Sequence, residues 1–226
     1  MHEFSVAEVA EVLDFAVLKP DQTFADIESA AALCRQWLIG CLCVQPAAVF
    51  RAANLLQDQK TVIASVVGFP HGANTTAVKA HEARVAIDDG ARELDMVLAL
   101  HALKDGDHKT VHNDIAAVVN EARASDVAVK VILETCYLNE EQIILACQIA
   151  ESAGALFIKT STGFGSRGAT PEVVRIMLDT VDGRIGVKAS GGIRTWDDCV
   201  SYLKMGCSRI GVGDPRRVLT GGSQPD

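Results

Sequence analysis

Two lysines stand inside short runs of apolar and β-branched residues, an unusual place for a charge. Lys159 lies in Phe157–Ser161 and Lys188 in Gly186–Ser190, 29 residues apart, about one strand-and-helix unit. We therefore expect them on adjacent strands, where mutual repulsion and burial lower the pKa of at least one ammonium group. A lysine pKa brought from about 10.4 to roughly 7–8 leaves a free amine, which adds to a carbonyl group and forms an imine.

Asp95 is a third charge in a comparable segment, Glu93–Ala99. Beside the lysines it would supply the acid–base catalysis that carbinolamine and enamine steps need. The alternative interpretation is a set of ion-paired charges that fill a polar interior layer without chemistry. For Lys130 and Glu134, which share the parity of one strand, an internal ion pair is the prediction.

The segments that would position these residues alternate between β-rich runs and Ala-rich amphipathic stretches. Eight such units predict one (β/α)8 barrel over residues 1–226, with a short N-terminal helix and a loose tail at 221–226; an open doubly wound sheet is the alternative. The predicted strands are Phe15–Lys19, Cys41–Gln45, Thr61–Gly68, Glu93–Ala99, Ala128–Glu134, Leu156–Ser161, Ile185–Ser190 and Arg209–Gly213. The predicted helices are Thr23–Leu38, Thr75–Asp88, Val111–Arg123, Asn139–Ser152, Thr170–Leu178 and Thr195–Met205.

Glycines at a constant distance from the candidate residues support this arrangement. We expect them to end helices in the left-handed conformation, so that the residue five positions later reaches the C-terminal mouth of the barrel. Gly40, Gly90, Gly154, Gly183 and Gly206 lead in this way to Gln45, Asp95, Lys159, Lys188 and Gly211. Cys43 lies two positions below Gln45 and would approach the same mouth.

A second group of glycines follows the last strands. Gly191 and Gly192 follow the seventh predicted strand, and Gly211 and Gly213 lie at the end of the eighth. Loops at these two places commonly bind phosphate in barrels, because glycine lets backbone N–H groups approach an anion. The loop Gly163–Gly168 is placed to close over such a ligand.

Composition excludes several other classes of protein. The 226 residues carry a net charge of −8, and 49% of them are apolar but only 5% aromatic, which argues against disorder and against binding to nucleic acid or an anionic membrane. Seven cysteines without a C-x-x-C motif indicate reduced thiols and a cytoplasmic protein. His108 and His112 lack the glutamate of a zinc-hydrolase motif, so no metal site is predicted.

Six segments in the same order resemble deoxyribose-phosphate aldolases over nearly the whole chain. They are Leu18–Pro20, Gly68–Pro70, Glu93–Val97, Lys130–Thr135, Phe157–Gly163 and Gly186–Arg194. The resemblance implies a class I aldolase on a (β/α)8 barrel, free of metal and cofactor, cytoplasmic and homodimeric. Its implied reaction is the reversible cleavage of 2-deoxy-D-ribose 5-phosphate to D-glyceraldehyde 3-phosphate and acetaldehyde, in deoxyribonucleotide catabolism.

The resemblance also implies a role for individual residues. Lys159 would be the Schiff-base nucleophile; Lys188 would lower its pKa and, with Asp95, relay protons. Asp14 matches the aspartate of the family's first-strand pattern and joins the catalytic set. The implied substrate and phosphate site consists of Thr162, Gly163, Gly191, Gly192, Gly211 and Gly213.

This chain departs from the family pattern in three places. A hydroxyl of the first strand is replaced by Ala16, and no tyrosine follows Tyr202 in the C-terminal segment. Two serines of the strand-eight turn are replaced by Gly213 and Asp214. A carboxylate repels a phosphate by about 1–4 kcal/mol per unit charge at roughly 4 Å.

Two arginines lie close enough in sequence to bear on that repulsion. Arg216 and Arg217 follow the altered turn directly and would offset it, whereas the sequence assigns no role to Arg167. Two further functions therefore stay open. One is an aldolase for unphosphorylated aldehydes, and the other is a barrel that binds sugar phosphates without catalysis.

Overall fold

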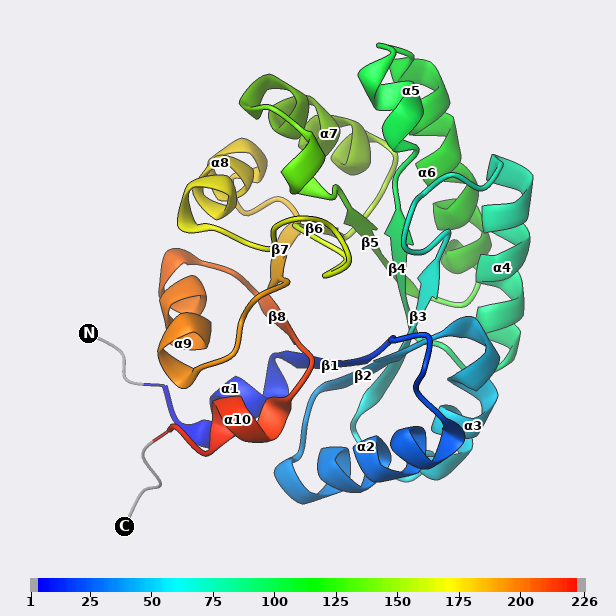
Figure 1. The fold of residues 1–226 in the computed structure, drawn as a ribbon. Helices are drawn as coiled ribbons and strands as arrows, with labels where there is room; N and C mark the ends of the chain where they lie inside the picture. Colours follow the sequence, from blue (N-terminus) through cyan, green and yellow to red (C-terminus); the bar gives the residue numbers. More distant parts are fainter. Residues whose placement is uncertain (1–3, 223–226) are drawn as a thin grey trace.

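The computed structural model describes residues 4–222, and its centre is a closed barrel of eight parallel strands. Each strand pairs with the next along the chain, and β1 also pairs with β8 (Figure 1). The strands are β1 Leu13–Val17, β2 Cys41–Val44, β3 Val62–Val67, β4 Glu93–Val97, β5 Ala128–Ile132, β6 Phe157–Lys159, β7 Gly186–Ser190 and β8 Arg209–Val212. The barrel prediction is thereby confirmed, and the open sheet is excluded.

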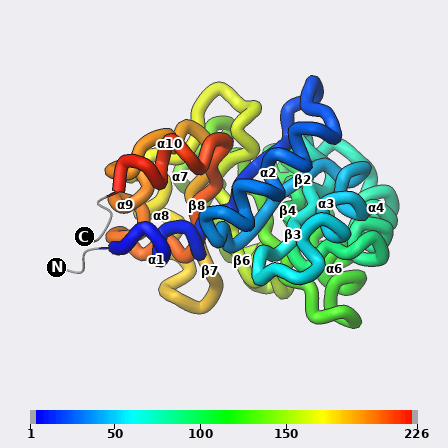
Figure 2. Tube along the Cα trace, turned by 90° about the horizontal axis from the view of Figure 1, so that it is seen from below, coloured from blue at the N-terminus to red at the C-terminus, as the bar shows by residue number. Residues whose placement is uncertain are grey.

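Helices follow the strands and surround the barrel, as the end-on and side views show (Figures 1 and 2). Their bounds are α1 Val6–Glu11, α2 Phe24–Trp37, α3 Val49–Leu55, α4 Thr76–Asp88, α5 Leu100–Lys104, α6 His108–Arg123, α7 Glu140–Ser152, α8 Pro171–Val181, α9 Trp196–Met205 and α10 Pro215–Leu219. Two 3₁₀ turns, η1 Pro46–Ala48 and η2 Thr135–Tyr137, follow β2 and β5. The short helix α1 is the predicted N-terminal helix.

Capping and short length explain where the observed helices differ from the predicted ones. Helix α6 begins three residues before the predicted start at Val111, because the Asp107 side chain accepts a hydrogen bond from Thr110 N and caps it there. The short helices α3, α5 and α10 were not among the predicted segments. They are one to two turns long, too short for an apolar period to stand out.

The first strand begins and ends two residues earlier than predicted. Its predicted end, Leu18–Lys19, belongs instead to a turn in which Lys19 N donates to the side chain of Gln22. Gln45, predicted as the last residue of β2, also lies just beyond its strand, and its Nε2 donates to the carbonyls of Leu18 and Lys19. The earlier start brings Asp14 into β1 and therefore into the barrel.

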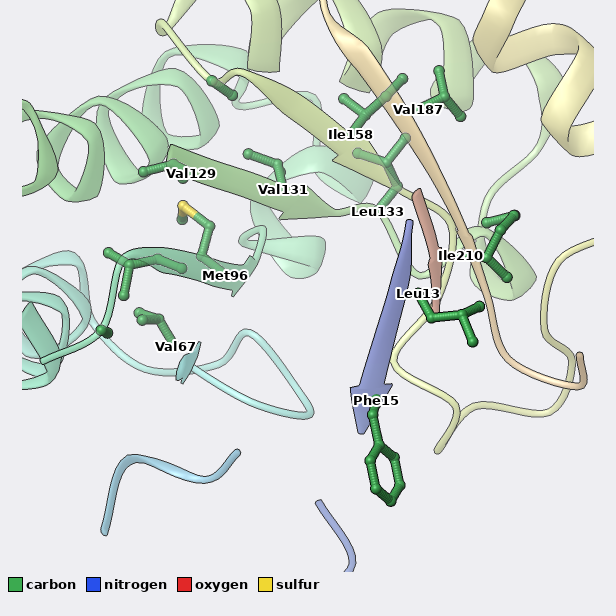
Figure 3. Close-up of a cluster of buried hydrophobic side chains, with 14 of the residues drawn as sticks. Leu13, Phe15, Val67, Met96, Val129, Val131, Leu133, Ile158, Val187 and Ile210 are labelled. Atoms are coloured by element: carbon green, nitrogen blue, oxygen red, sulfur yellow. The ribbon is translucent and has the colours of Figure 1, made fainter. Parts of the chain in front are cut away.

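Side chains alternate along each strand between the two faces of the barrel wall. The outward set packs against the helices and forms the main core; Leu13, Met96, Val131 and Ile158 belong to it (Figure 3). The inward residues of β2 and β3 are small and apolar, Cys43 among them, whereas Asp14 of β1 and residues of β4–β8 supply the charges. The barrel interior is therefore apolar on one side and charged on the other.

The glycines predicted to end helices have two different roles. Gly90, Gly154, Gly183 and Gly206 all have positive φ, between 72° and 116°. Gly40 does not; Leu38 takes the left-handed position after α2 in its place. A Cβ at Gly40 would lie 1.9 Å from the carbonyl oxygen of Glu11, so glycine is required there by close approach to α1.

The predicted tail falls only partly within the described residues. Gly221 and Gly222 pack closely on the Trp196 side chain, and residues 223–226 lie outside the described part of the chain. No helix within residues 4–222 is both long enough and apolar enough to span a lipid bilayer.

We predict that Gly40→Ala lowers the free energy of unfolding by about 1–3 kcal/mol, because the new methyl group meets backbone rather than a movable side chain. Urea titration followed by circular dichroism measures this change. Gly213→Ala is the control: no atom lies within 4 Å of a Cβ there, so its effect should stay within about 0.5 kcal/mol. Equal stabilities of the two variants would contradict this account of Gly40.

Candidate active site

The inward faces of β1 and β4–β8 bring seven charged side chains together inside the barrel. They are Asp14, Glu93, Asp95, Lys130, Lys159, Lys188 and Arg209. Lys159 and Lys188 are direct neighbours in the β6–β7 register, as their spacing predicted. Five of the seven residues are at most 3% exposed, so their charges interact with little screening from water.

Asp95 is the centre of this group. Its Oδ2 accepts a hydrogen bond of 2.7 Å from Lys159 Nζ and another of 2.7 Å from Lys188 Nζ. Its Oδ1 accepts from Lys130 Nζ at 2.8 Å. Burial opposes ionisation, but the three lysines hold the pKa of Asp95 well below its usual range. One carboxylate therefore joins all three lysines of the barrel interior.

Asp14 is the second carboxylate of the network. It pairs with Lys188 Nζ through Oδ2, with Lys130 Nζ at 3.3 Å, and with Arg209 Nη1 at 2.9 Å through Oδ1. Burial again opposes ionisation, and these cations lower the pKa of Asp14. Lys188 thus lies between two carboxylates, whereas Lys159 has only one.

The three lysines differ in pKa because they differ in carboxylate partners. Burial, the largest influence on Lys159, lowers its pKa; Asp95 opposes this, and the neighbouring Lys188 ammonium lowers it further. For Lys130 and Lys188 the effect of burial is exceeded by that of Asp14 and Asp95, which raise both pKa values. Lys159 is therefore the lysine from which a proton is most easily lost.

The prediction that Lys130 pairs with Glu134 is wrong. Lys130 Nζ instead contacts Asp14, Asp95 and Glu93. Glu134 follows the end of β5 with φ 51°, a left-handed conformation that breaks the strand alternation on which the prediction depended.

Glu134 holds a turn of the site that sequence reasoning did not assign to it. Its buried carboxylate accepts hydrogen bonds from the backbone N–H and the hydroxyl of Thr162, and the same hydroxyl accepts from Phe164 N at 3.0 Å. The ring of Phe164 meets that of Phe69 edge-on, 5.4 Å between centroids. Glu134 thereby fixes the segment that begins three residues after Lys159.

A cavity of about 450 Å³ opens above the charged group. It reaches Asp14, Lys159 and Lys188 and is bordered by all the predicted phosphate residues, Thr162, Gly163, Gly191, Gly192, Gly211 and Gly213. Asp95 is not part of its lining, because the lysines cover it. Three of the four predicted catalytic residues and all the predicted phosphate residues therefore line one cavity, and Asp95 is hydrogen-bonded to two of its lysines.

Positive φ angles and close contacts between backbone segments explain the glycines of this border. Gly191 and Gly192 have φ of 85° and 82°, where a side chain would be strained. A Cβ on Gly168 would lie 2.0 Å from the carbonyl oxygen of Gly191, so the loop 163–168 and the turn after β7 are packed backbone to backbone.

The altered turn after β8 presents a carboxylate to the same cavity. Asp214 lines it, and its Oδ1 caps α10 by accepting from Arg217 N at 3.4 Å. Arg194 and Arg217 also border the cavity, whereas Arg167 and Arg216 do not. The cavity border thus includes Asp214 together with two arginine residues.

Cysteines on the apolar side complete the site. Cys43 lines the cavity, with its Sγ 3.9 Å from Asp95 Oδ2, and burial raises its pKa to about 11.

Within residues 4–222, ligand atoms suited to a metal gather at Asp14, Cys41 and Glu93. Lys130 and Arg209 already pair with both carboxylates, and burial raises the Cys41 pKa, so this group favours an ion-pair network over a metal site.

Glu93 and Arg209 are members of the network that sequence reasoning missed. Each is the first residue of its strand, and Glu93 shares the parity of Asp95 as Arg209 shares that of Gly211. Their position on the inward-facing side of the predicted strands was the sequence signal from which both could have been predicted.

Comparison with known proteins agrees with this geometry. Residues 9–212 match the model of a family described as DeoC/LacD family aldolase. The chain belongs to the DeoC/LacD aldolase family. A deoxyribose-phosphate aldolase of Carboxydothermus hydrogenoformans is 44% identical to this aldolase over 219 residues, which are 96% of each chain.

Solved structures are similar to this aldolase over nearly its whole length. A crystal structure of a protein from Coccidioides immitis has a TM-score of 0.93 at 35% identity and covers 97% of this chain and 87% of its own. A deoxyribose phosphate aldolase from Aeropyrum pernix, described as tetrameric, has a TM-score of 0.90 at 29% identity and covers 96% of this chain and 91% of its own.

We predict that Asp95→Asn lowers the free energy of unfolding by roughly 3–5 kcal/mol, because three buried lysines lose their common counter-charge. Chemical denaturation at neutral pH measures the change. The matched control is Asp182→Asn, whose side chain is 87% exposed and whose effect should stay within about 0.5 kcal/mol. A loss at Asp95 no larger than at Asp182 would show that Asp95 does not hold the network together.

Proposed function

We propose that this chain is a class I aldolase that reversibly cleaves 2-deoxy-D-ribose 5-phosphate to D-glyceraldehyde 3-phosphate and acetaldehyde. The observation that carries the proposal is the position of Lys159, a buried lysine with a lowered pKa at the base of a cavity, joined to Asp95 beside Lys188. Family membership and the similarity to a deoxyribose-phosphate aldolase support this substrate.

Lys159 acts as the nucleophile. Its free amine adds to the C1 aldehyde of the open-chain sugar, and the carbinolamine loses water to give a protonated imine. Removal of the proton from the C3 hydroxyl then breaks the C2–C3 bond, and the bonding electrons move into the imine to form an enamine. Glyceraldehyde 3-phosphate leaves; protonation of the enamine at C2 and hydrolysis of the imine release acetaldehyde and restore the amine.

Asp95 and Lys188 are assigned the proton transfers. Their 2.7 Å hydrogen bond shares an oxygen with Lys159, so a proton released at the amine has an adjacent acceptor and donor. Asp14, in contact with Lys188, keeps that lysine charged. The protonated imine supplies the electron sink of the cleavage, and the proposed mechanism therefore needs no metal or cofactor.

The phosphate group is assigned to the opposite end of the cavity. Backbone N–H groups around Gly191, Gly192 and Gly213 suit an anion, and Thr162, Gly163 and Gly211 complete the border. Arg194 and Arg217 offset the repulsion from Asp214.

The setting of the enzyme is also part of the proposal. Seven free cysteines support a cytoplasmic enzyme. The substrate supports a place in deoxyribonucleotide breakdown. The family resemblance supports a homodimer, and light scattering after size-exclusion chromatography would test it.

We predict that borohydride with acetaldehyde reduces an imine on Lys159 and adds a two-carbon group to that residue. The reason is that Lys159 lines the cavity and that burial lowers its pKa. Peptide mass spectrometry locates the adduct, and a coupled assay measures cleavage of 2-deoxyribose 5-phosphate.

Lys159→Met should abolish both the adduct and the turnover. Lys104→Met is a control for loss of a lysine outside the cavity and should keep both. Full activity with Lys159 unmodified, or an adduct only on other lysines, would rule out the proposed nucleophile.

A further prediction concerns Asp214. Asp214→Ser keeps an oxygen that caps α10 and removes the charge, so KM for 2-deoxyribose 5-phosphate should fall about fivefold or more, the equivalent of ~1 kcal/mol of relieved repulsion. Steady-state kinetics with 2-deoxyribose as the comparison substrate isolate the phosphate effect. A KM that is unchanged, or that moves equally for both sugars, would place the phosphate away from Asp214.

A further inference from the structure

A second group of ion pairs lies in the barrel interior on the side of the strand N-termini. Glu93 and Arg209 are the first residues of β4 and β8, and Arg209 Nη2 donates to Glu93 Oε1 at 2.6 Å. Arg209 also donates to Asp14 Oδ1 at 2.9 Å, and Glu93 pairs with Lys130. Neither residue lines the cavity to which the substrate is assigned.

Both residues connect to Lys159 through the carboxylates of the site. From Glu93 the path runs through Lys130 to Asp95, and from Arg209 it runs through Asp14 and Lys188 to Asp95. Asp95 then bonds Lys159. A change of charge at either end therefore alters the partners of Asp95 without removing a group that touches substrate.

The whole interior has a specific balance of charge. Three carboxylates, Asp14, Glu93 and Asp95, face four basic groups, Lys130, Lys159, Lys188 and Arg209. With all seven ionised the interior holds one excess positive charge, and with Lys159 uncharged it is neutral. Burial opposes the charge of Arg209, but Asp14 and Glu93 raise its pKa, so arginine is a permanent member of the cationic set.

We propose that Glu93 and Arg209 are positioning residues that set the protonation state of Lys159 from the far end of the barrel. The proposal rests on the Schiff-base function proposed above. Arg209, Lys130 and Lys188 together carry three positive charges, which balance the three negative charges of Asp14, Glu93 and Asp95. Lys159 then has no carboxylate that requires its proton.

The groups that face Lys159 come from the strands around it. Direct neighbours are Asp95 of β4, Lys188 of β7 and the Cys43 thiol of β2. Behind them lie Asp14 of β1, Glu93 of β4, Lys130 of β5 and Arg209 of β8. The inward residues of β3, among them Ala64 and Val66, carry no charge.

Loss of the Arg209 charge and loss of the Glu93 charge must shift the pKa of Lys159 in opposite directions. Loss of the Arg209 charge leaves the interior more negative, so Lys159 holds its proton to higher pH. Loss of the Glu93 charge leaves the interior more positive, so Lys159 loses its proton at lower pH. A purely structural role of the pair would instead lower stability or activity without opposite shifts along the pH axis.

Four variants test this: Arg209→Met, Glu93→Gln, the double variant with both changes, and Arg209→Lys. The pH dependence of kcat/KM for 2-deoxyribose 5-phosphate is measured, together with the pH dependence of acetaldehyde trapping on Lys159 by borohydride. We expect the acid limb to move up by about one pH unit in Arg209→Met and down by a similar amount in Glu93→Gln. In the double variant and in Arg209→Lys it should return close to wild type, because the charge balance is restored.

The same acid limb in all variants, or shifts of one sign in Arg209→Met and Glu93→Gln, would overturn the proposal. Circular dichroism checks that each variant is folded. If Arg209→Met does not fold, the comparison of Glu93→Gln with the wild type still decides the sign. Failure of the proposed function is recognised separately, because the wild type would then neither cleave the sugar phosphate nor be trapped on Lys159.

Discussion

Inside the closed barrel, four basic groups share three carboxylates, and the rest of the site depends on this constraint. Asp14 and Asp95 each bind more than one cation, and Lys130 and Lys188 each bind at least two carboxylates. Among the three lysines inside the barrel, Lys159 is the one that relies on a single carboxylate, and it shares that carboxylate with the other two. The lowered pKa of Lys159 therefore follows from the arrangement of the whole network, since burial alone would act on all three lysines alike.

The barrel makes this arrangement possible because strand alternation separates two tasks. Outward side chains such as Met96 and Val131 supply the apolar packing with the helices, so inward positions of the same strands are available for Asp95 and Lys130. Backbone contacts at glycines then bring the loops over the site, as where Gly168 packs on Gly191. Stability comes mainly from one face of each strand and chemistry from the other.

Much of this could be predicted from the sequence, because a charge within a buried parallel strand stands out. The eight strands, the pairing of Lys159 with Lys188 and the cavity border formed by Gly191 and Gly192 follow from spacing and parity. The partners of Lys130 could not be predicted. Glu134 lies beyond the end of β5 in a left-handed backbone conformation, and the sequence there contains no glycine or asparagine that would indicate it.

The most direct test of the charge balance is an NMR titration of the protein labelled with ¹³C at the lysine ε-carbons, with Lys159 assigned from its absence in Lys159→Met. The account predicts that Lys159 titrates below the usual lysine range, whereas Lys130 and Lys188 stay charged through it. A Lys159 that titrates at or above the ordinary lysine value, or a Lys188 that loses its proton first, would contradict it.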